Sequence, residues 1–382
     1  MLHFSPAEFE RRRDAVKAAL AEHKLDAILM FAQESMYWLT GYDTFGYRFF
    51  QCLVFKADGE MALLTRSADL RQAQLTSNIE TVKIWTDSAH ANPAANLRDM
   101  LSEMGLLGAR LGIEYDTHGL TAHDGKLVDN ALTSFASLTD ASQLVFDLRM
   151  VKSAEEVAHV RKAAEWADLA YDAALAETGP GVSEGHILAA MQGAVFEAGG
   201  DYPGNPFIIG SGEEALLCRY KSGRRDLSAN DQLTLEWAGV HANYHVAMMR
   251  TLVVGKPKPE HEAHFNAARD ALLAVQDAMQ VGNTFGDLFE AHAATLDHAG
   301  YARHRLNACG YSLGARFAPS WMDGPMFYAN SPVVIQPNMV LFAHMIIMDS
   351  DTQTAMCVGH TYLSGEDGPE PLSRHGLDFV AL

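Results

Sequence analysis

The sequence predicts an α/β domain over residues 1–145 followed by an α+β domain over residues 150–382. The chain of 382 residues is longer than one typical domain, and 48% of its residues are hydrophobic, which is enough for two cores. Short apolar segments alternate with helical stretches up to about residue 140, and a long charged amphipathic helix then begins. We therefore expect the domain boundary between residues 140 and 152.

The first domain opens with Ser5 and Pro6, a pair typical of a helix start, and that amphipathic helix is expected to end near residue 23. Apolar runs bounded by turn residues then predict strands. These are DAILMF (26–31), a hairpin in QCLVFKADGEMALLT (51–65) and ARLGIEYD (109–116). Helical stretches between these strands indicate the α/β class.

The second domain opens with Ser153 three residues before Glu156, which is a capping-box pattern at the start of a long helix. The elements expected next are a helix at 183–198, strands in QLTLEWAG (232–239) and HVAMMRTLVVG (245–255), and two more helices. From residue 306 onward, strand-like runs alternate with turns. Helices and strands in this order indicate the α+β class.

The charge balance limits the classes of partner. With 48 acidic and 29 basic residues, the formal net charge of −19 repels nucleic acid and anionic membranes, so neither is an expected partner. No signal-peptide pattern or long uncharged apolar run is evident, and we expect a cytoplasmic protein. The cysteines are too few and too widely spaced for a disulfide framework, and free thiols are expected at Cys52, Cys218, Cys309 and Cys357.

Four sequence blocks occur in a specific order along the chain. They are KSAEE (152–156), RTLVVG (250–255), GYSLG (310–314) and NMVLFAH (338–344). Together they resemble the pita-bread metallopeptidase family, which includes aminopeptidase P, prolidase and creatinase. The resemblance covers nearly the whole chain and implies a creatinase/prolidase-like N-terminal domain and a pita-bread catalytic domain.

Metal-dependent members of that family hold two divalent ions with two aspartates, one histidine and two glutamates. In this sequence the five positions carry Glu236, Ala247, Cys309, His344 and Gly359. Because Ala247 and Gly359 cannot coordinate a metal, the resemblance implies a branch without the di-metal centre, and no metal or other cofactor is expected. A single zinc site is the alternative. Its candidate ligands are Cys309 and His344, with Glu236 or His360.

Two metal-free relatives differ in how well they match. Creatinase also has alanine at the position of Ala247, but its two catalytic glutamates fall on Met249 and His344. The ectoine hydrolase pattern is closer. Its segments correspond here to Gly199–Pro203, Leu235–Gly239, Tyr244–His245, Gly310–Gly314 and Pro319–Trp321. Cys309 and His344 depart from that pattern, so we expect shared chemistry on a different substrate.

The strongest catalytic candidate is Glu236, because it lies in an otherwise apolar strand and a buried carboxylate needs a partner or a proton. By resemblance to ectoine hydrolase it would act as nucleophile or general base, and a structural ion pair is the alternative. His245 and His344 could move a proton, or could be structural histidines. Arg219 could bind a substrate carboxylate, or could form a surface salt bridge.

Further residues are candidates for substrate binding. Aromatic side chains could wall a cationic or zwitterionic substrate, although aromatics in strands are more often part of the core. The aromatic candidates are Tyr202, Trp237, Tyr311 and Trp321, and the polar ones are Cys309 and His360. By resemblance to creatinase, Tyr47 and Arg48 would reach into the active site of the partner in a homodimer. A buried hairpin with Arg48 pointing outward is the alternative.

These observations predict a metal-independent hydrolase that cleaves a C–N bond, of amidine, amide or ureido type, in a small zwitterionic nitrogenous compound. Three alternatives remain open. The first is a metallopeptidase of the Xaa-Pro aminopeptidase or dipeptidase type, and the second is a binding protein without catalytic activity. The third is a lyase, because the same fold also carries lyase chemistry.

Overall fold

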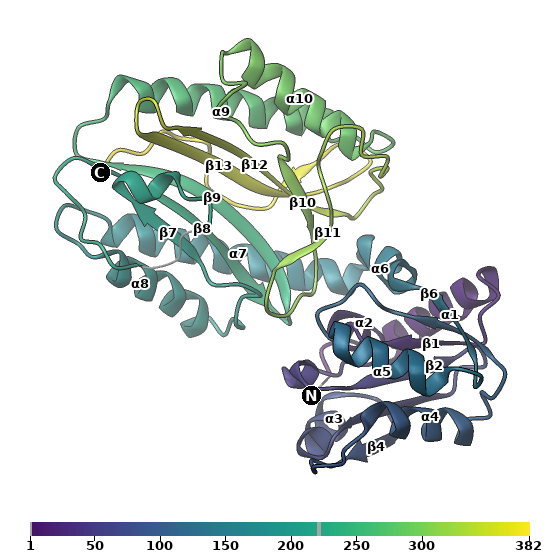
Figure 1. Ribbon diagram of the computed structural model, residues 1–382. Helices are drawn as coiled ribbons and strands as arrows, with labels where there is room; N and C mark the ends of the chain where they lie inside the picture. The colour runs from purple at the N-terminus through teal and green to yellow at the C-terminus, as the bar shows by residue number, and fades with distance from the viewer. Residues whose placement is uncertain (1, 220–222) are drawn as a thin grey trace. The chain divides into compact units, whose positions relative to one another are not determined.

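The computed structural model describes residues 2–219 and 223–382 (Figure 1). The chain divides into two compact units, Met1–Arg149 and Met150–Leu382. Each unit has its own sheet and its own apolar core. Within the described residues, no helix is both long and apolar enough to span a membrane.

The first unit is built on a six-stranded mixed sheet with the order β4-β3-β2-β1-β5-β6. The strands are β1 (Ala27–Met30), β2 (Cys52–Lys56), β3 (Met61–Arg66), β4 (Thr81–Trp85), β5 (Arg110–Ile113) and β6 (Ser137–Asp140). The α-helices are α1 (Pro6–Glu22), α2 (Gln33–Thr40), α3 (Leu70–Thr76), α4 (Pro93–Glu103), α5 (Ala122–Leu132) and α6 (Ser142–Met150). The central strand β1 pairs antiparallel with β2 and parallel with β5.

Strand β1 is apolar throughout because both faces of its sheet are covered. Ala27 and Leu29 belong to one buried cluster, whereas Ile28 and Met30 belong to another. Alternate residues of a strand point to opposite faces, so a doubly covered strand is expected to be hydrophobic at every position. This explains why the segment was recognisable from the sequence as a buried strand.

The second unit is built on an eight-stranded sheet with the order β11-β10-β12-β13-β9-β8-β7, with β14 paired to β13. The strands are β7 (Ile208–Ser211), β8 (Asp231–His241), β9 (Tyr244–Val254), β10 (Gly310–Leu313), β11 (Met322–Met326), β12 (Val340–Asp349), β13 (Thr354–Leu363) and β14 (Glu370–Pro371). The α-helices are α7 (Ala154–Glu177), α8 (Glu184–Glu197), α9 (Pro259–Ala278) and α10 (Phe285–His298). The α/β plus α+β class predicted from the sequence is confirmed.

Helices α7 and α9 cover the sheet of the second unit. Helix α7 packs on β8 and β9, and α9 packs on β12 and β13 (Figure 1). The start of α7 is fixed by the expected capping box: the Glu156 amide donates to Ser153 Oγ at 3.3 Å, and the Ser153 amide donates to Glu156 Oε2 at 2.8 Å. The capping box therefore sets where the long helix begins along the sheet.

Strand β8 approaches α7 very closely. The indole Nε1 of Trp237 donates a hydrogen bond to the main-chain oxygen of Ala167 at 2.8 Å, and the Trp237 ring stacks on Tyr171 with 5.2 Å between centroids. Two residues along, a Cβ on Gly239 would lie only 2.0 Å from the main-chain oxygen of Ala163. Only glycine allows this approach, because a side chain would meet helix backbone that cannot rotate away.

We predict that Gly239→Ala lowers the free energy of unfolding by about 2–3 kcal/mol or more, as expected for overpacking against rigid backbone. Urea denaturation followed by tryptophan fluorescence measures this change. The matched control is Gly193→Ala in α8, where an added Cβ meets nothing within 4 Å, and this variant should be neutral or more stable. Equal stability of Gly239→Ala and wild type would contradict the close approach of β8 to α7.

Candidate active site

The second unit contains a cavity of about 350 Å³. Glu236 lines this cavity while its neighbour Trp237 packs on α7, so the cavity lies on the sheet face opposite that helix. The lining residues that can bind or react are Cys218, Arg219, Glu236, Tyr311, Trp321 and His344. A concave site with apolar walls and a few polar groups is the usual form of a small-molecule site.

One row of paired residues crosses the sheet beneath the cavity. In order of neighbouring strands, the row consists of Ile208, Glu236, Met249, Gly359 and His344. Three strand spacings separate Glu236 from His344, which is about 14 Å measured along the sheet. The two side chains therefore approach the cavity from different sides.

Glu236 is a buried carboxylic acid with a perturbed pKa. The residue is 9% exposed, and desolvation raises its pKa from the usual 4.5 to about 7. A hydrogen bond from Tyr311 and the positive charge of Arg219 act in the opposite direction and lower the pKa. The group is therefore poised to take up and release a proton near neutral pH, which general acid–base chemistry requires.

Tyr311 and Trp321 orient the Glu236 carboxylate. The Tyr311 hydroxyl donates to Glu236 Oε1 at 3.1 Å, and Trp321 Nε1 donates to the Tyr311 hydroxyl at 2.9 Å. Trp321 is itself held by Asn205, whose Oδ1 accepts a hydrogen bond from the Trp321 main-chain amide at 3.1 Å. The Glu236 carboxylate and the rings of Tyr311 and Trp321 are all buried, so these hydrogen bonds fix Oε1 of Glu236 in place.

His344 lies on the other side of the cavity as a neutral imidazole. Burial, together with the nearby His292, lowers its pKa to about 3. Its ring is flanked by Tyr311 and Phe342, with centroid distances of 5.6 and 5.4 Å. Within the described residues its buried Nδ1 has no hydrogen-bond partner. A buried, unpaired ring nitrogen beside a cavity is suited to bind a polar group of a ligand.

Arg219 and Cys218 line the same cavity from the segment after β7. Arg219 is exposed, and its positive charge reaches Glu236, whose pKa it lowers. Cys218 is half-buried, and desolvation and the charge of Glu236 raise the pKa of its thiol. A thiol with a raised pKa is a poor nucleophile, so Arg219 is the residue of this pair that suits substrate binding.

His245 does not line the cavity, although we predicted a catalytic role for it. It is fully buried, and its Nε2 accepts a hydrogen bond from the main-chain amide of Gly204 at 2.8 Å. Burial lowers its pKa to about 4, so the ring is neutral. His245 therefore anchors the loop before β7, which agrees with the alternative of a structural histidine and not with a position at the cavity.

Three other predicted binding residues face away from the cavity. Trp237 packs on α7, as described above. The Cys309 thiol is buried in the apolar core, where its Sγ lies 3.9 Å from the main-chain oxygen of Leu288. His360 follows Gly359 on β13 and therefore points to the opposite face, where burial lowers its pKa to about 3. The structure does not bring these three residues to the cavity: strand alternation turns Trp237 and His360 to the other face, and Cys309 packs in the core before β10.

Tyr202 also lies outside the cavity lining. It is 83% exposed and its ring contacts Phe196, with 5.0 Å between centroids, so it does not wall the site. In the first unit, Tyr47 is buried whereas Arg48 is exposed. The predicted contribution of Tyr47 and Arg48 to the active site of a second subunit stays a prediction.

The residues present do not fit a di-metal centre. Of the five positions that the family uses for metal ligands, Glu236 and His344 line the cavity and Cys309 is turned into the core. At Gly359 an added Cβ would lie 2.9 Å from Met249 Cβ and 2.9 Å from the Phe342 ring. Apolar side chains therefore fill the space that a carboxylate at this position would need.

Sequence reasoning missed Asn205, Asn307 and Met249 as cavity residues. Met249 lies directly across the β8–β9 ladder from Glu236, so strand pairing could have placed it beside the carboxylate. Asn205 and Asn307 come from loops that precede β7 and β10. No motif marks these loop positions, and only the tertiary fold brings them together.

Comparisons with known proteins agree with this architecture. The chain matches the Metallopeptidase family M24 over residues 158–366 and the Creatinase/Prolidase N-terminal domain over residues 12–151. It is 26% identical over 361 residues to the ectoine hydrolase of Halomonas elongata, with 88% of each chain covered. It is also 26% identical over 392 residues to an uncharacterized hydrolase/peptidase of Sinorhizobium fredii, with 100% of this chain and 99% of the relative covered.

Solved structures show the same fold. A recombinant prolidase from Thermococcus sibiricus has a TM-score of 0.88 at 18% identity, over 98% of this chain and 99% of that one. A dipeptidase from Mycobacterium ulcerans has a TM-score of 0.85 at 22% identity, over 99% of both chains. Because the family match spans more than half of the sequence, the chain belongs to the Metallopeptidase family M24. The predicted resemblance is confirmed, and the protein is a hydrolase of this pita-bread family.

The raised pKa of Glu236 predicts a specific pH dependence of stability. A folded-state pKa of about 7 against an ordinary 4.5 means that the folded chain holds a proton that the unfolded chain has released. The contribution of Glu236 is therefore fully present below pH 4.5 and is lost as the pH rises through about 7. We expect the difference in free energy of unfolding between wild type and Glu236→Gln to change by roughly 3 kcal/mol across that window.

Denaturant titrations at pH 4 and pH 8 measure this change. Glu366→Gln is the matched control, because Glu366 is exposed. The free energy of unfolding of this variant should differ from that of wild type by the same amount at both pH values. If Glu236→Gln follows the control, the carboxylate is not buried as described.

Proposed function

We propose that this chain is a metal-independent hydrolase that cleaves a C–N bond in a small zwitterionic nitrogenous compound, with Glu236 as the catalytic residue. The observation that carries this proposal is the buried Glu236 carboxylate in the cavity. Its pKa is near neutrality, and apolar packing takes the place of metal-ligating carboxylates around it. The similarity to ectoine hydrolase supports the type of bond cleaved.

In the reaction we infer, Glu236 acts first as a base and then as an acid. It takes a proton from water as the water oxygen forms a bond to the amide, amidine or ureido carbon. When the C–N bond breaks, the protonated carboxyl returns that proton to the leaving nitrogen. A pKa of about 7 suits both steps, because each form of the group is well populated near neutral pH.

Direct attack by Glu236 on the same carbon is the alternative route. A mixed anhydride would then form as the C–N bond breaks, and the leaving nitrogen would take a proton from water. The resulting hydroxide would attack the Glu236 carbonyl carbon and release the substrate acid. Tyr311 binds Oε1, so Oε2 would be the attacking oxygen. Single-turnover hydrolysis in heavy-oxygen water distinguishes the routes, since only the covalent one transfers label to the Glu236 side chain.

His344 and Arg219 have binding roles in this proposal. With a pKa of about 3, His344 cannot serve as a cationic acid at neutral pH, so its neutral ring would hydrogen-bond the substrate instead. Arg219 would bind a substrate carboxylate through its planar guanidinium group. A cavity of about 350 Å³ is at the small end of ligand sites, which favours a compact substrate over a long peptide.

A homodimer is also part of the proposal. Arg48 is exposed between two exposed aromatic side chains, Phe45 at 75% and Phe49 at 44%. Large apolar side chains grouped on a surface are typical of protein contacts. By resemblance to creatinase, Tyr47 and Arg48 of this segment would reach the active site of a second subunit.

Two of the rival functions, a metallopeptidase and a binding protein, make different predictions. A metal-dependent peptidase would lose activity with a chelator and would regain it with added metal, and the prolidase structures resemble this chain in fold. A binding protein without activity would release its ligand intact after long incubation. Screening ectoine, creatine, betaines and proline dipeptides by mass spectrometry, with and without chelator, separates all three functions.

With a substrate from that screen, we expect Glu236→Gln to lower kcat at least 100-fold, because the amide cannot accept the proton. Chelator-treated wild type should keep full activity, and Glu366→Gln should match wild type. Retained hydrolysis in Glu236→Gln would exclude Glu236 as the catalytic group.

We further expect kcat/KM to rise with pH through an apparent pKa near 7, since the base form of Glu236 is the active one. Tyr311→Phe should move this apparent pKa upward, because the lost hydrogen bond normally lowers the pKa of Glu236. Tyr328→Phe is the control, as Tyr328 is 46% exposed. An unchanged pH profile in Tyr311→Phe would argue against the assignment of this pKa to Glu236.

A further inference from the structure

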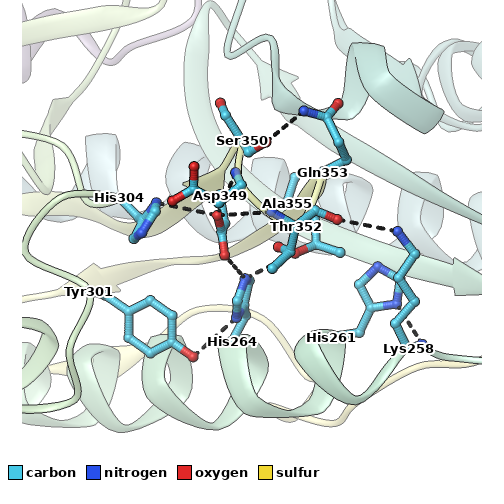
Figure 2. A network of polar contacts seen from close by, with 12 residues as sticks. Lys258, His261, His264, Tyr301, His304, Asp349, Ser350, Thr352, Gln353 and Ala355 are labelled. Atoms are coloured by element: carbon cyan, nitrogen blue, oxygen red, sulfur yellow. Dashed lines mark hydrogen bonds and ion pairs between the residues drawn. The ribbon is translucent and has the colours of Figure 1, made fainter.

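A second group of polar side chains lies at the turn between β12 and β13 (Figure 2). The turn covers residues 350–353, and it follows Asp349, the last residue of β12. His304, from the segment between α10 and β10, points toward Asp349 in this view, and His264 of α9 lies on the other side of the same carboxylate. Elements that are distant in the sequence therefore converge on one aspartate.

Three of these side chains can each offer a ligand atom to one ion. The ligand atoms of His304, Asp349 and Asp351 all lie within 4.8 Å of one another. Among the residues that the structure describes, this is the one such group of three or more His, Cys, Asp or Glu side chains. An imidazole nitrogen with two carboxylate oxygens is a ligand set that suits zinc and similar first-row divalent ions.

The spacing of the first pair suits a shared ion better than a direct bond. His304 Nδ1 is 3.6 Å from Asp349 Oδ1, which is too long for a hydrogen bond. Two ligands that each lie about 2.1 Å from one tetrahedral zinc ion are about 3.4 Å apart. Asp349 and His304 are thus already at the separation of two metal ligands, and Asp351 is exposed and can rotate toward them.

The Asp349 carboxylate is also held in place by its surroundings. Its Oδ1 accepts main-chain hydrogen bonds from Asp351 at 2.9 Å and Thr352 at 3.3 Å, and its Oδ2 lies 3.5 Å from His264 Nε2. His264 is 3% exposed and is oriented by the Tyr301 hydroxyl, 3.1 Å from its Nδ1. Supporting residues of this kind orient metal ligands in known sites.

We propose that His304, Asp349 and Asp351 bind one zinc-like divalent cation at the β12–β13 turn, outside the cavity. Ile346, which lines the cavity, precedes Asp349 by three residues along β12, so Asp349 lies about 10 Å along the strand from the cavity wall. The ion would tie the β12–β13 hairpin to the segment before β10. It would stabilise the fold and take no part in the reaction at Glu236, so this proposal does not depend on the proposed function.

The full-length protein, stripped with chelator and dialysed, should bind one Zn²⁺ per chain in isothermal titration calorimetry, and its melting temperature should rise with added Zn²⁺. His304→Gln and Asp351→Asn should each weaken binding about 10-fold or more and should remove the thermal shift. His298→Gln and Asp367→Asn remove the same groups at exposed positions elsewhere, and both should behave as wild type.

Two outcomes would overturn the proposal. One is binding in wild type that is no tighter than in His304→Gln and Asp351→Asn. The other is Zn²⁺ stoichiometry that falls in Glu236→Gln, which would place the ion in the cavity and would also count against the metal-independent mechanism. Anomalous diffraction from a zinc-soaked crystal locates the ion directly.

Discussion

A carboxylate buried on one face of a strand is the constraint around which the cavity is organised. Glu236 has apolar neighbours on β7 and β9, and desolvation there raises the pKa of its carboxyl group. The hydrogen bond from Tyr311 and the charge of Arg219 oppose this rise, and the pKa is about 7. Trp321 in turn orients Tyr311, so the acid–base property of one residue depends on several loops and strands.

The same face of the sheet lacks the set of carboxylates that a di-metal centre needs. A di-metal centre needs several carboxylates within a few ångströms, and their mutual repulsion is relieved by the ions. Here Gly359 leaves room that Met249 and Phe342 occupy, and Ala247 is buried beside them. A lone carboxylate in such apolar surroundings has a raised pKa, which suits proton transfer near neutral pH, whereas a metal ligand must be deprotonated.

The buried histidines differ in the groups that their ring nitrogens contact, and these contacts indicate different roles. His245 and His344 are both neutral because desolvation lowers their pKa values. His245 has its Nε2 engaged by a main-chain amide, whereas His344 keeps a ring nitrogen without a partner beside the cavity. His264 is buried too, but it contacts Asp349 at the far end of β12, where it supports a carboxylate and not a substrate.

By itself, the sequence determined the fold class, the order of elements and the position of Glu236 within a buried strand, because hydrophobic periodicity, capping residues and an acid within an apolar run are local signals. It also indicated that Ala247 and Gly359 cannot bind metal. Only the tertiary structure decided which candidates face the cavity. Strand alternation turned Trp237 and His360 away from it, and strand pairing brought Met249 and Tyr311 to Glu236. Those relations depend on register and on contacts between distant segments, which local sequence patterns do not encode.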